Sequence, residues 1–151
     1  MSFLKMLIGG GSPDTQNAPT KALDPEWRKG PRGGFNRLFD VDLDYFALEG
    51  KGGVYVLWHK GVQPAWVYIG FTDSLIAALD TAKDNPEFRQ YDVNGGLYYS
   101  WSPILPEMRY GVVAYLRENL EPLYENLPGE ALPEEDEDGD PIKPIAVLLP
   151  R

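Results

Sequence analysis

Tyr55 and Tyr68 are the residues of this chain whose type and setting first point to chemistry. Each lies in a short run that is rich in β-formers and bounded by glycine, at 53–57 and at 67–70. The sequence leaves two roles open for the pair, one catalytic and one structural. It favours the structural role, because aromatic side chains pair well across antiparallel strands.

The only histidine and a row of aspartates are further candidates. His59 stands alone beside a turn, so we expect a surface residue rather than a metal ligand or a base. Asp40, Asp42 and Asp44 alternate with apolar residues, and on a strand they would form one acidic face able to bind a hard cation. A short helix capped by Asp42 fits the following residues better, and the acids then form a solvated first turn. The sequence therefore predicts no metal site and no cofactor.

The only basic cluster of this acidic chain lies at 27–37. Four of its residues could hold a polyanion: Arg28, Lys29, Arg32 and Arg37. They could equally pair with acids of this chain or of a partner. With 23 acidic and 14 basic side chains the net charge is −9, and nucleic-acid binding draws most of its affinity from basic residues. Nucleic acid is therefore an unlikely main partner.

Together, the two tyrosine runs resemble the signature of the GIY-YIG nuclease superfamily, in which adjacent strands carry Gly-Ile-Tyr and Tyr-Ile-Gly. Further matches follow the second run and close the resemblance, which covers roughly residues 50–127: Thr72, Leu75, Pro122, Tyr124 and Asn126. The resemblance implies a small α/β scaffold and a metal-dependent phosphodiesterase site lined by both tyrosines.

The same resemblance fails at the residues that carry the family's chemistry. Ala78 stands where the family has an arginine, Ala82 where it has a histidine or tyrosine, and Val113 where it has a metal-binding glutamate. Neither alanine nor valine can hold a cation or stabilise charge on a phosphate. We therefore expect a catalytically inactive domain that acts as a protein-interaction module or as an accessory subunit of a larger assembly.

Two alternatives remain open at this point. The first is a nuclease with relocated groups, in which Tyr55 and Tyr68 work with Arg109 and Glu118, or with Arg89 and Glu121 in the same roles. The second is a module that binds a small ligand or a peptide through aromatic residues, namely Trp58, Trp66, Tyr98, Tyr99 and Trp101.

The predicted fold class is α/β of the α+β kind, with a three-stranded antiparallel sheet flanked by helices. Strands are expected at 53–59, 65–70 and 97–101, and helices at 73–83 and 106–120. Thr72 or Asp73 would cap the first helix. Apolar residues recur at helical spacing in the second helix and include Val113, which favours replacement of the family's glutamate over misalignment. By length the chain forms one domain.

Three parts are expected along the chain: an apolar segment with a linker at 1–26, the GIY-YIG-like domain at 27–128, and an acidic loop with an apolar end at 129–151. The apolar residues of the two ends are predicted partner anchors: Phe3, Leu4, Leu7, Ile8, Val147, Leu148 and Leu149. They could also dock on this chain, and residues 1–8 could touch a membrane surface. A chain without cysteine fits a cytoplasmic setting, and the apolar residues 1–8 fit a membrane-peripheral one.

Overall fold

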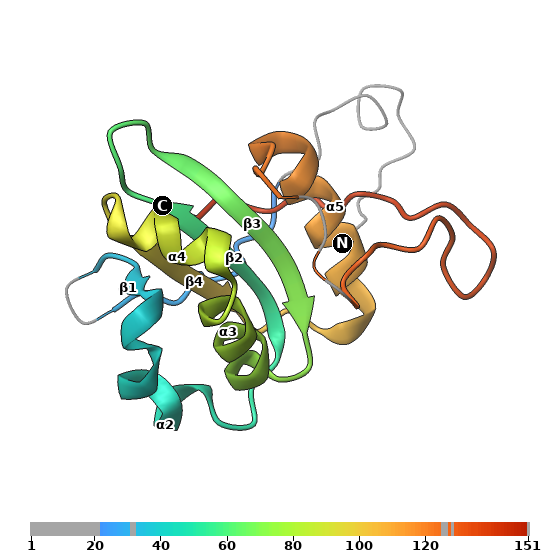
Figure 1. The fold of residues 1–151 in the computed structure, drawn as a ribbon. Coiled ribbons are helices and arrows are strands. Elements are labelled where there is room, and N and C mark those ends of the chain that lie inside the picture. Colours follow the sequence, from blue (N-terminus) through green and yellow to red (C-terminus); the bar gives the residue numbers. More distant parts are fainter. Residues whose placement is uncertain (1–21, 31–32, 125–126, 128, 151) are drawn as a thin grey trace.

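The computed structural model describes residues 22–30, 33–124, 127 and 129–150, which form a mixed α+β fold around one antiparallel sheet (Figure 1). The four strands are β1 (Asn36–Arg37), β2 (Gly53–His59), β3 (Ala65–Thr72) and β4 (Leu97–Ser102), in the order β1-β4-β2-β3. The helices are the 3-10 helix η1 (Leu38–Asp44), α2 (Tyr45–Leu48), α3 (Leu75–Lys83), α4 (Pro86–Val93) and α5 (Pro106–Leu120).

The predicted hairpin is confirmed as β2 and β3. Tyr55 lies opposite Gly70, and Leu57 lies opposite Tyr68, so the two tyrosines are diagonal neighbours on adjacent strands. Their ring centroids are 5.9 Å apart. The tyrosine pair is therefore a real structural unit.

The sheet has four strands rather than the three that the sequence predicts. The third predicted strand is β4, which pairs with β2 on the side away from β3. The additional strand is β1, which pairs with β4 through Asn36 and Arg37 alone. Two residues are too few to produce an alternating pattern, so tertiary pairing defines this strand.

Two helices depart from the expectation in their boundaries. Ser74, not Thr72 or Asp73, caps α3, and its hydroxyl accepts a hydrogen bond from Ala77 N at 3.3 Å. The sequence also predicts no helix at α4 (Pro86–Val93). Proline is well suited to the first turn of a new helix, and the Asn85 side chain caps α4. The region of the predicted aspartate row is helical, as expected, but the 3-10 helix η1 already begins at Leu38, so Asp42 lies inside it and is not its cap.

Each face of the sheet carries its own apolar cluster. Alternate residues of β2 divide between them, because successive side chains of a strand point to opposite faces. Tyr55 and Leu57 join the cluster under η1, α3 and α4, whereas Val54 and Val56 join the cluster under α5. Val113 is fully buried in the α5 cluster, as the predicted apolar stripe requires. Within the described residues, no helix is long and apolar enough to cross a membrane.

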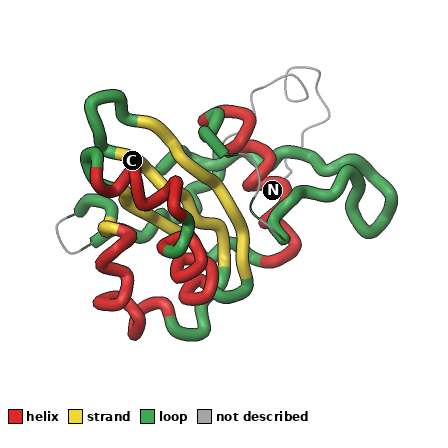
Figure 2. The backbone as a smooth tube through the Cα atoms, in the orientation of Figure 1, coloured by secondary structure: helices red, strands yellow, loops and turns green. Residues whose placement is uncertain are grey.

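The described residues after α5 form no further helix or strand and run back across the molecule (Figure 2). Its apolar end docks on this chain: Val147 is 2% exposed and forms a parallel bridge with Leu23. Ile145 N donates to Gly111 O at 2.9 Å, which fixes the segment against α5. The C-terminal segment thus belongs to the α5 cluster of the domain instead of forming a separate unit.

Gly111 is the point of closest approach between α5 and the C-terminal segment. A Cβ atom there would lie 2.6 Å from Ile145 Cδ1 and 2.7 Å from Lys143 O. The second neighbour is backbone, so the segment itself would have to move. The contact therefore requires glycine in the middle of a helix, where glycine costs about 1 kcal/mol relative to alanine.

We predict that Gly111→Ala destabilises the protein by about 1–3 kcal/mol in spite of the better helix propensity of alanine, because overpacking displaces the C-terminal segment. Urea unfolding of both proteins measures the difference. Gly34→Ala is the matched control, since nothing lies within 4 Å of a Cβ at that position, and it should change stability by less than about 0.5 kcal/mol. Equal stability of the two variants would contradict the docking.

Candidate functional site

The hydroxyls of Tyr55 and Tyr68 converge on one carboxylate, that of Glu130. Tyr55 Oη lies 3.0 and 2.9 Å from the two carboxylate oxygens, and Tyr68 Oη lies 3.1 Å from Oε1. Phe71 N donates to the same Oε1 at 3.1 Å. Both tyrosine side chains are fully buried. Three donors thus hold the Glu130 side chain in place.

Glu130 reaches the tyrosines because the segment that follows α5 runs along the free edge of β3. Leu123 N donates to Trp66 O at 3.1 Å, and Tyr124 N donates to Val67 O at 3.0 Å. Leu127 N then donates to Tyr68 Oη at 3.1 Å. The Tyr68 hydroxyl therefore donates to Glu130 and accepts from Leu127 N and, at 3.4 Å, from Arg117 Nη2, which uses its full capacity.

Arg117 of α5 is the fourth member of this cluster. Its guanidinium donates to Ile69 O from Nε at 3.0 Å and from Nη2 at 2.8 Å. Nη2 also lies 3.3 Å from Glu130 O, and the guanidinium carbon is 5.6 Å from the centroid of the Tyr68 ring. We call Tyr55, Tyr68, Arg117 and Glu130 the tyrosine cluster.

Burial controls the ionisation of the tyrosine cluster. Burial raises the pKa of Tyr55 well above its ordinary value, and the charge of Glu130 raises it further. Burial likewise raises the pKa of Tyr68. The pKa of Glu130 is also raised by burial, although the hydrogen bonds from both tyrosines oppose that shift. The phenols therefore stay protonated near neutral pH and cannot act as bases there.

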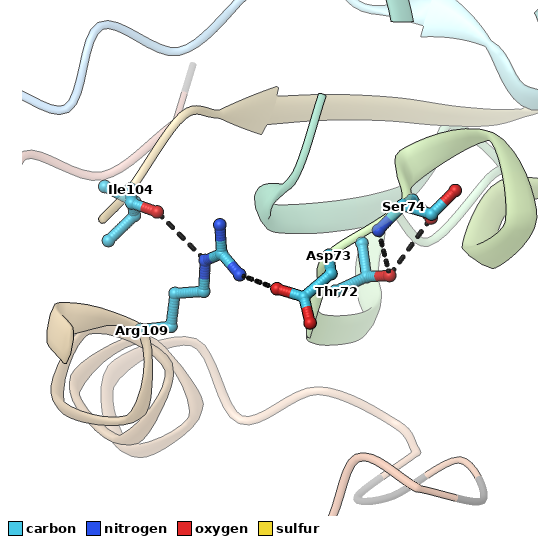
Figure 3. A network of polar contacts seen from close by, with 5 residues as sticks. All are labelled: Thr72, Asp73, Ser74, Ile104 and Arg109. Carbon is cyan, nitrogen blue, oxygen red and sulfur yellow. Dashed lines mark hydrogen bonds and ion pairs between the residues drawn. The ribbon is translucent and has the colours of Figure 1, made fainter. Parts of the chain in front are cut away.

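A cavity of about 420 Å³ opens beside Glu130, between α3 and the start of α5. Arg109 enters this cavity from α5 and makes two contacts (Figure 3): its Nε donates to Ile104 O at 2.9 Å, and its Nη1 lies 2.6 Å from Asp73 Oδ1. The Arg109 side chain is 12% exposed, whereas that of Asp73 is 95% exposed. Ala78 also lines this cavity, to which it contributes only a methyl group.

The structure does not bring the predicted relocated catalytic residues together. Arg109 pairs with Asp73 instead of the tyrosines, and Glu118 is exposed on α5. Sequence reasoning missed the two residues that do meet the tyrosines, Arg117 and Glu130. Arg117 lies one position before Glu118, and Glu130 lies in the predicted acidic loop at 129–151. No local pattern marks either of them.

The predicted polyanion-binding residues fall into three groups. Arg37 pairs with Asp92 at 2.9 Å. The largest single influence on Asp92 is burial, which would raise its pKa, but the hydrogen bonds from Arg37 and from Leu97 N outweigh it and lower the pKa. Arg28 and Lys29 line a second cavity, and Arg32 lies outside the described residues.

The predicted anchors also differ in their placement. Phe3, Leu4, Leu7 and Ile8 lie outside the described residues. Leu148 and Leu149 are 50% and 38% exposed and remain available to a partner. Val147, in contrast, is buried in the α5 cluster of its own domain, so it is not available as an anchor.

His59 is not the surface residue that the sequence predicts. It is 8% exposed, because the Tyr91 ring of α4 covers it edge-on at a centroid distance of 4.9 Å. Its Nδ1 has no hydrogen-bond partner. Within the described part of the chain, no group of three or more histidine, cysteine, aspartate or glutamate side chains is placed to hold a metal ion.

We predict that Glu130→Ala destabilises the protein by about 1–3 kcal/mol for each tyrosine hydroxyl that it leaves without an acceptor. Repeating the substitution in a Tyr55→Phe/Tyr68→Phe background should cost much less, because those hydroxyls are then absent. Denaturant unfolding of the four proteins gives the coupling energy. Glu118→Ala is the exposed acidic control. A Glu130→Ala cost that is the same in both backgrounds would show that the hydroxyls do not depend on this carboxylate.

Comparisons with known proteins add no further assignment. No protein-family model matches the chain, and neither a curated protein nor a solved structure matches it. The function therefore has to be argued from the geometry of the tyrosine cluster and from the two cavities.

Proposed function

We propose that this chain is a catalytically inactive relative of the GIY-YIG nucleases that acts as a protein-interaction domain or accessory subunit. One observation carries the proposal: the hydroxyls of Tyr55 and Tyr68 both donate hydrogen bonds to the carboxylate of Glu130, a residue of the same chain. A tyrosine that serves a phosphodiesterase must present its hydroxyl to the substrate. Here both hydroxyls are buried and already bonded.

The surroundings of the tyrosine cluster support the same conclusion. Phosphodiester cleavage of this kind needs a divalent cation and a positive group at the phosphate. Ala78 lines the neighbouring cavity where the family's arginine would act, and Val113 lies in the opposite core cluster. Arg117 is committed to the Ile69 carbonyl. The cluster has the connectivity of a structural network, in which each buried polar group finds a partner.

Three exposed leucines, where the segment around Leu23 pairs with the C-terminal segment, support the interaction part of the proposal. Leu148 N donates to Leu23 O at 2.7 Å, so Leu23 lies beside Leu148 and Leu149, and all three are at least 37% exposed. Leu23 belongs to the same predicted segment, 1–26, as the anchors predicted at the front of the chain. A partner protein that covers these leucines would gain about 1.5–3 kcal/mol for each side chain that it buries fully.

The convergence of Arg117 and Glu130 on the tyrosines favours one alternative, a nuclease that uses Glu130 as its carboxylate. In such a nuclease the Glu130 carboxylate would have to give up its hydrogen bonds from Tyr55, Tyr68 and Phe71 N in order to bind a metal ion. The following assay separates the two functions.

We predict that the purified protein does not cleave DNA or RNA in the presence of Mg²⁺ or Mn²⁺, because the tyrosine hydroxyls are occupied. Gel analysis of single- and double-stranded substrates measures the cleavage. Tyr68→Phe and Glu130→Gln variants are assayed in parallel with Glu118→Gln as the exposed control. Cleavage by the unchanged protein and by Glu118→Gln, but not by the other two variants, would establish the nuclease and overturn the proposal.

We also predict that a protein partner depends on the exposed leucines. Full-length protein is purified from its native source and compared with a Leu148→Ser/Leu149→Ser variant. The variant should lose the partner while keeping its unfolding transition, because both leucines are exposed. Val62→Ser is the control, since Val62 is exposed on the far hairpin turn. Loss of the partner in both variants, or retention in both, would count against this surface.

A further inference from the structure

We infer that the second cavity is a binding site for a small organic phosphate, meaning a phosphate group attached to an apolar body. The inference is independent of the proposed function, because it concerns a cavity on another part of the molecule. The cavity measures about 650 Å³, which lies within the range typical of small-molecule sites.

The cavity combines an apolar floor with a basic rim. Leu48, Tyr99 and Trp101 form the buried part of the floor and are at most 8% exposed. Among the described residues, the charged side chains that line the cavity are all cationic: Arg28, Lys29 and Lys51. In a chain with a net charge of −9, three cations among the described lining residues are an unusual concentration of positive charge.

None of these three cations forms an ion pair with a described residue, whereas Arg37, Arg89 and Arg109 do. Three like charges at the mouth of one apolar cavity repel one another, and low-dielectric walls strengthen the field that they produce. An anion bound between them would relieve this repulsion. The arrangement therefore suits a ligand that carries more than one negative charge, as a phosphate monoester does, better than a single carboxylate.

Arg28 is held in position before any ligand arrives. Its N donates to Trp101 O at 2.8 Å, and its carbonyl accepts from Ser100 Oγ at 2.7 Å. Its guanidinium carbon lies 5.7 Å from the centroid of the Trp101 ring. A preorganised guanidinium loses less conformational entropy on binding, and its planar donors suit phosphate oxygens.

The basic residues do not continue as a track for an extended polyanion. Arg37 is the next described basic residue of the segment 27–37, and it forms an ion pair with Asp92. A nucleic acid needs a series of phosphate contacts along its backbone. The concave shape and the three cations at one place therefore favour a compact ligand over a nucleic acid.

The test uses full-length protein and phenyl phosphate as the probe, with binding measured by isothermal titration calorimetry. Saturable binding of one phenyl phosphate per chain is expected. A Lys29→Gln/Lys51→Gln variant should bind at least about tenfold more weakly, a loss that corresponds to about 1.4 kcal/mol. A Lys60→Gln/Lys143→Gln variant makes the same change in net charge at exposed lysines outside the cavity, and it should bind within about twofold of the unchanged protein.

Three results would overturn the inference. The first is no saturable binding of phenyl phosphate up to about 10 mM. The second is an equal loss of affinity in the two double variants, which would indicate a general charge effect. The third is that inorganic phosphate or a thymidine oligonucleotide binds as tightly as phenyl phosphate, which would mean that the apolar floor does not contribute. Thermal unfolding of each variant confirms that the protein remains folded.

Discussion

The carboxylate of Glu130 is the interaction on which the centre of this structure depends. Two phenols from neighbouring strands are fully buried, and a buried hydroxyl without a partner costs about 1–3 kcal/mol. Glu130 satisfies Tyr55 and Tyr68 together and also accepts from the backbone of β3. A residue 75 positions from Tyr55 thereby joins the segment after α5 to the middle of the sheet.

The same segment protects the open edge of the sheet. β3 is an edge strand, and its free backbone groups could pair with a strand of another molecule. Four of these groups are already hydrogen-bonded within the chain. Trp66 O accepts from Leu123 N, and Val67 O accepts from Tyr124 N. Ile69 O accepts from Arg117, and Phe71 N donates to Glu130. Strand addition at β3 is therefore blocked. A partner has to contact side chains elsewhere, such as the exposed Leu23, Leu148 and Leu149.

The two cavities differ in electrostatic character. The cavity beside Glu130 contains an internal ion pair, because Arg109 is bonded to Asp73, and it also contains the Glu130 carboxylate. Among the described residues, the charged groups that line the cavity beside Trp101 are all cations. Opposite charges in one cavity satisfy each other, whereas like charges leave a field that a ligand can use. The cavity beside Glu130 is thus the less suited of the two to hold an anion.

The sequence by itself determined the elements with a clear local period. Alternation in β2 assigns Tyr55 and Leu57 to one face and Val54 and Val56 to the other, and apolar spacing in α5 assigns Val113 to the core. These patterns predict the hairpin, β4, α3 and α5, because burial of one face places apolar residues at a regular spacing along a strand or helix.

Only the tertiary structure decided the rest. β1 is too short to have a period, and α4 begins at a proline that also ends the helix before it. His59 is buried by the Tyr91 ring of α4. Glu130 lies in the acidic loop of the sequence but accepts a hydrogen bond from the buried Tyr55. In each case the decisive contact comes from a distant part of the chain. Local pattern carries no record of such a contact, so the role of these side chains appears only once the chain has folded.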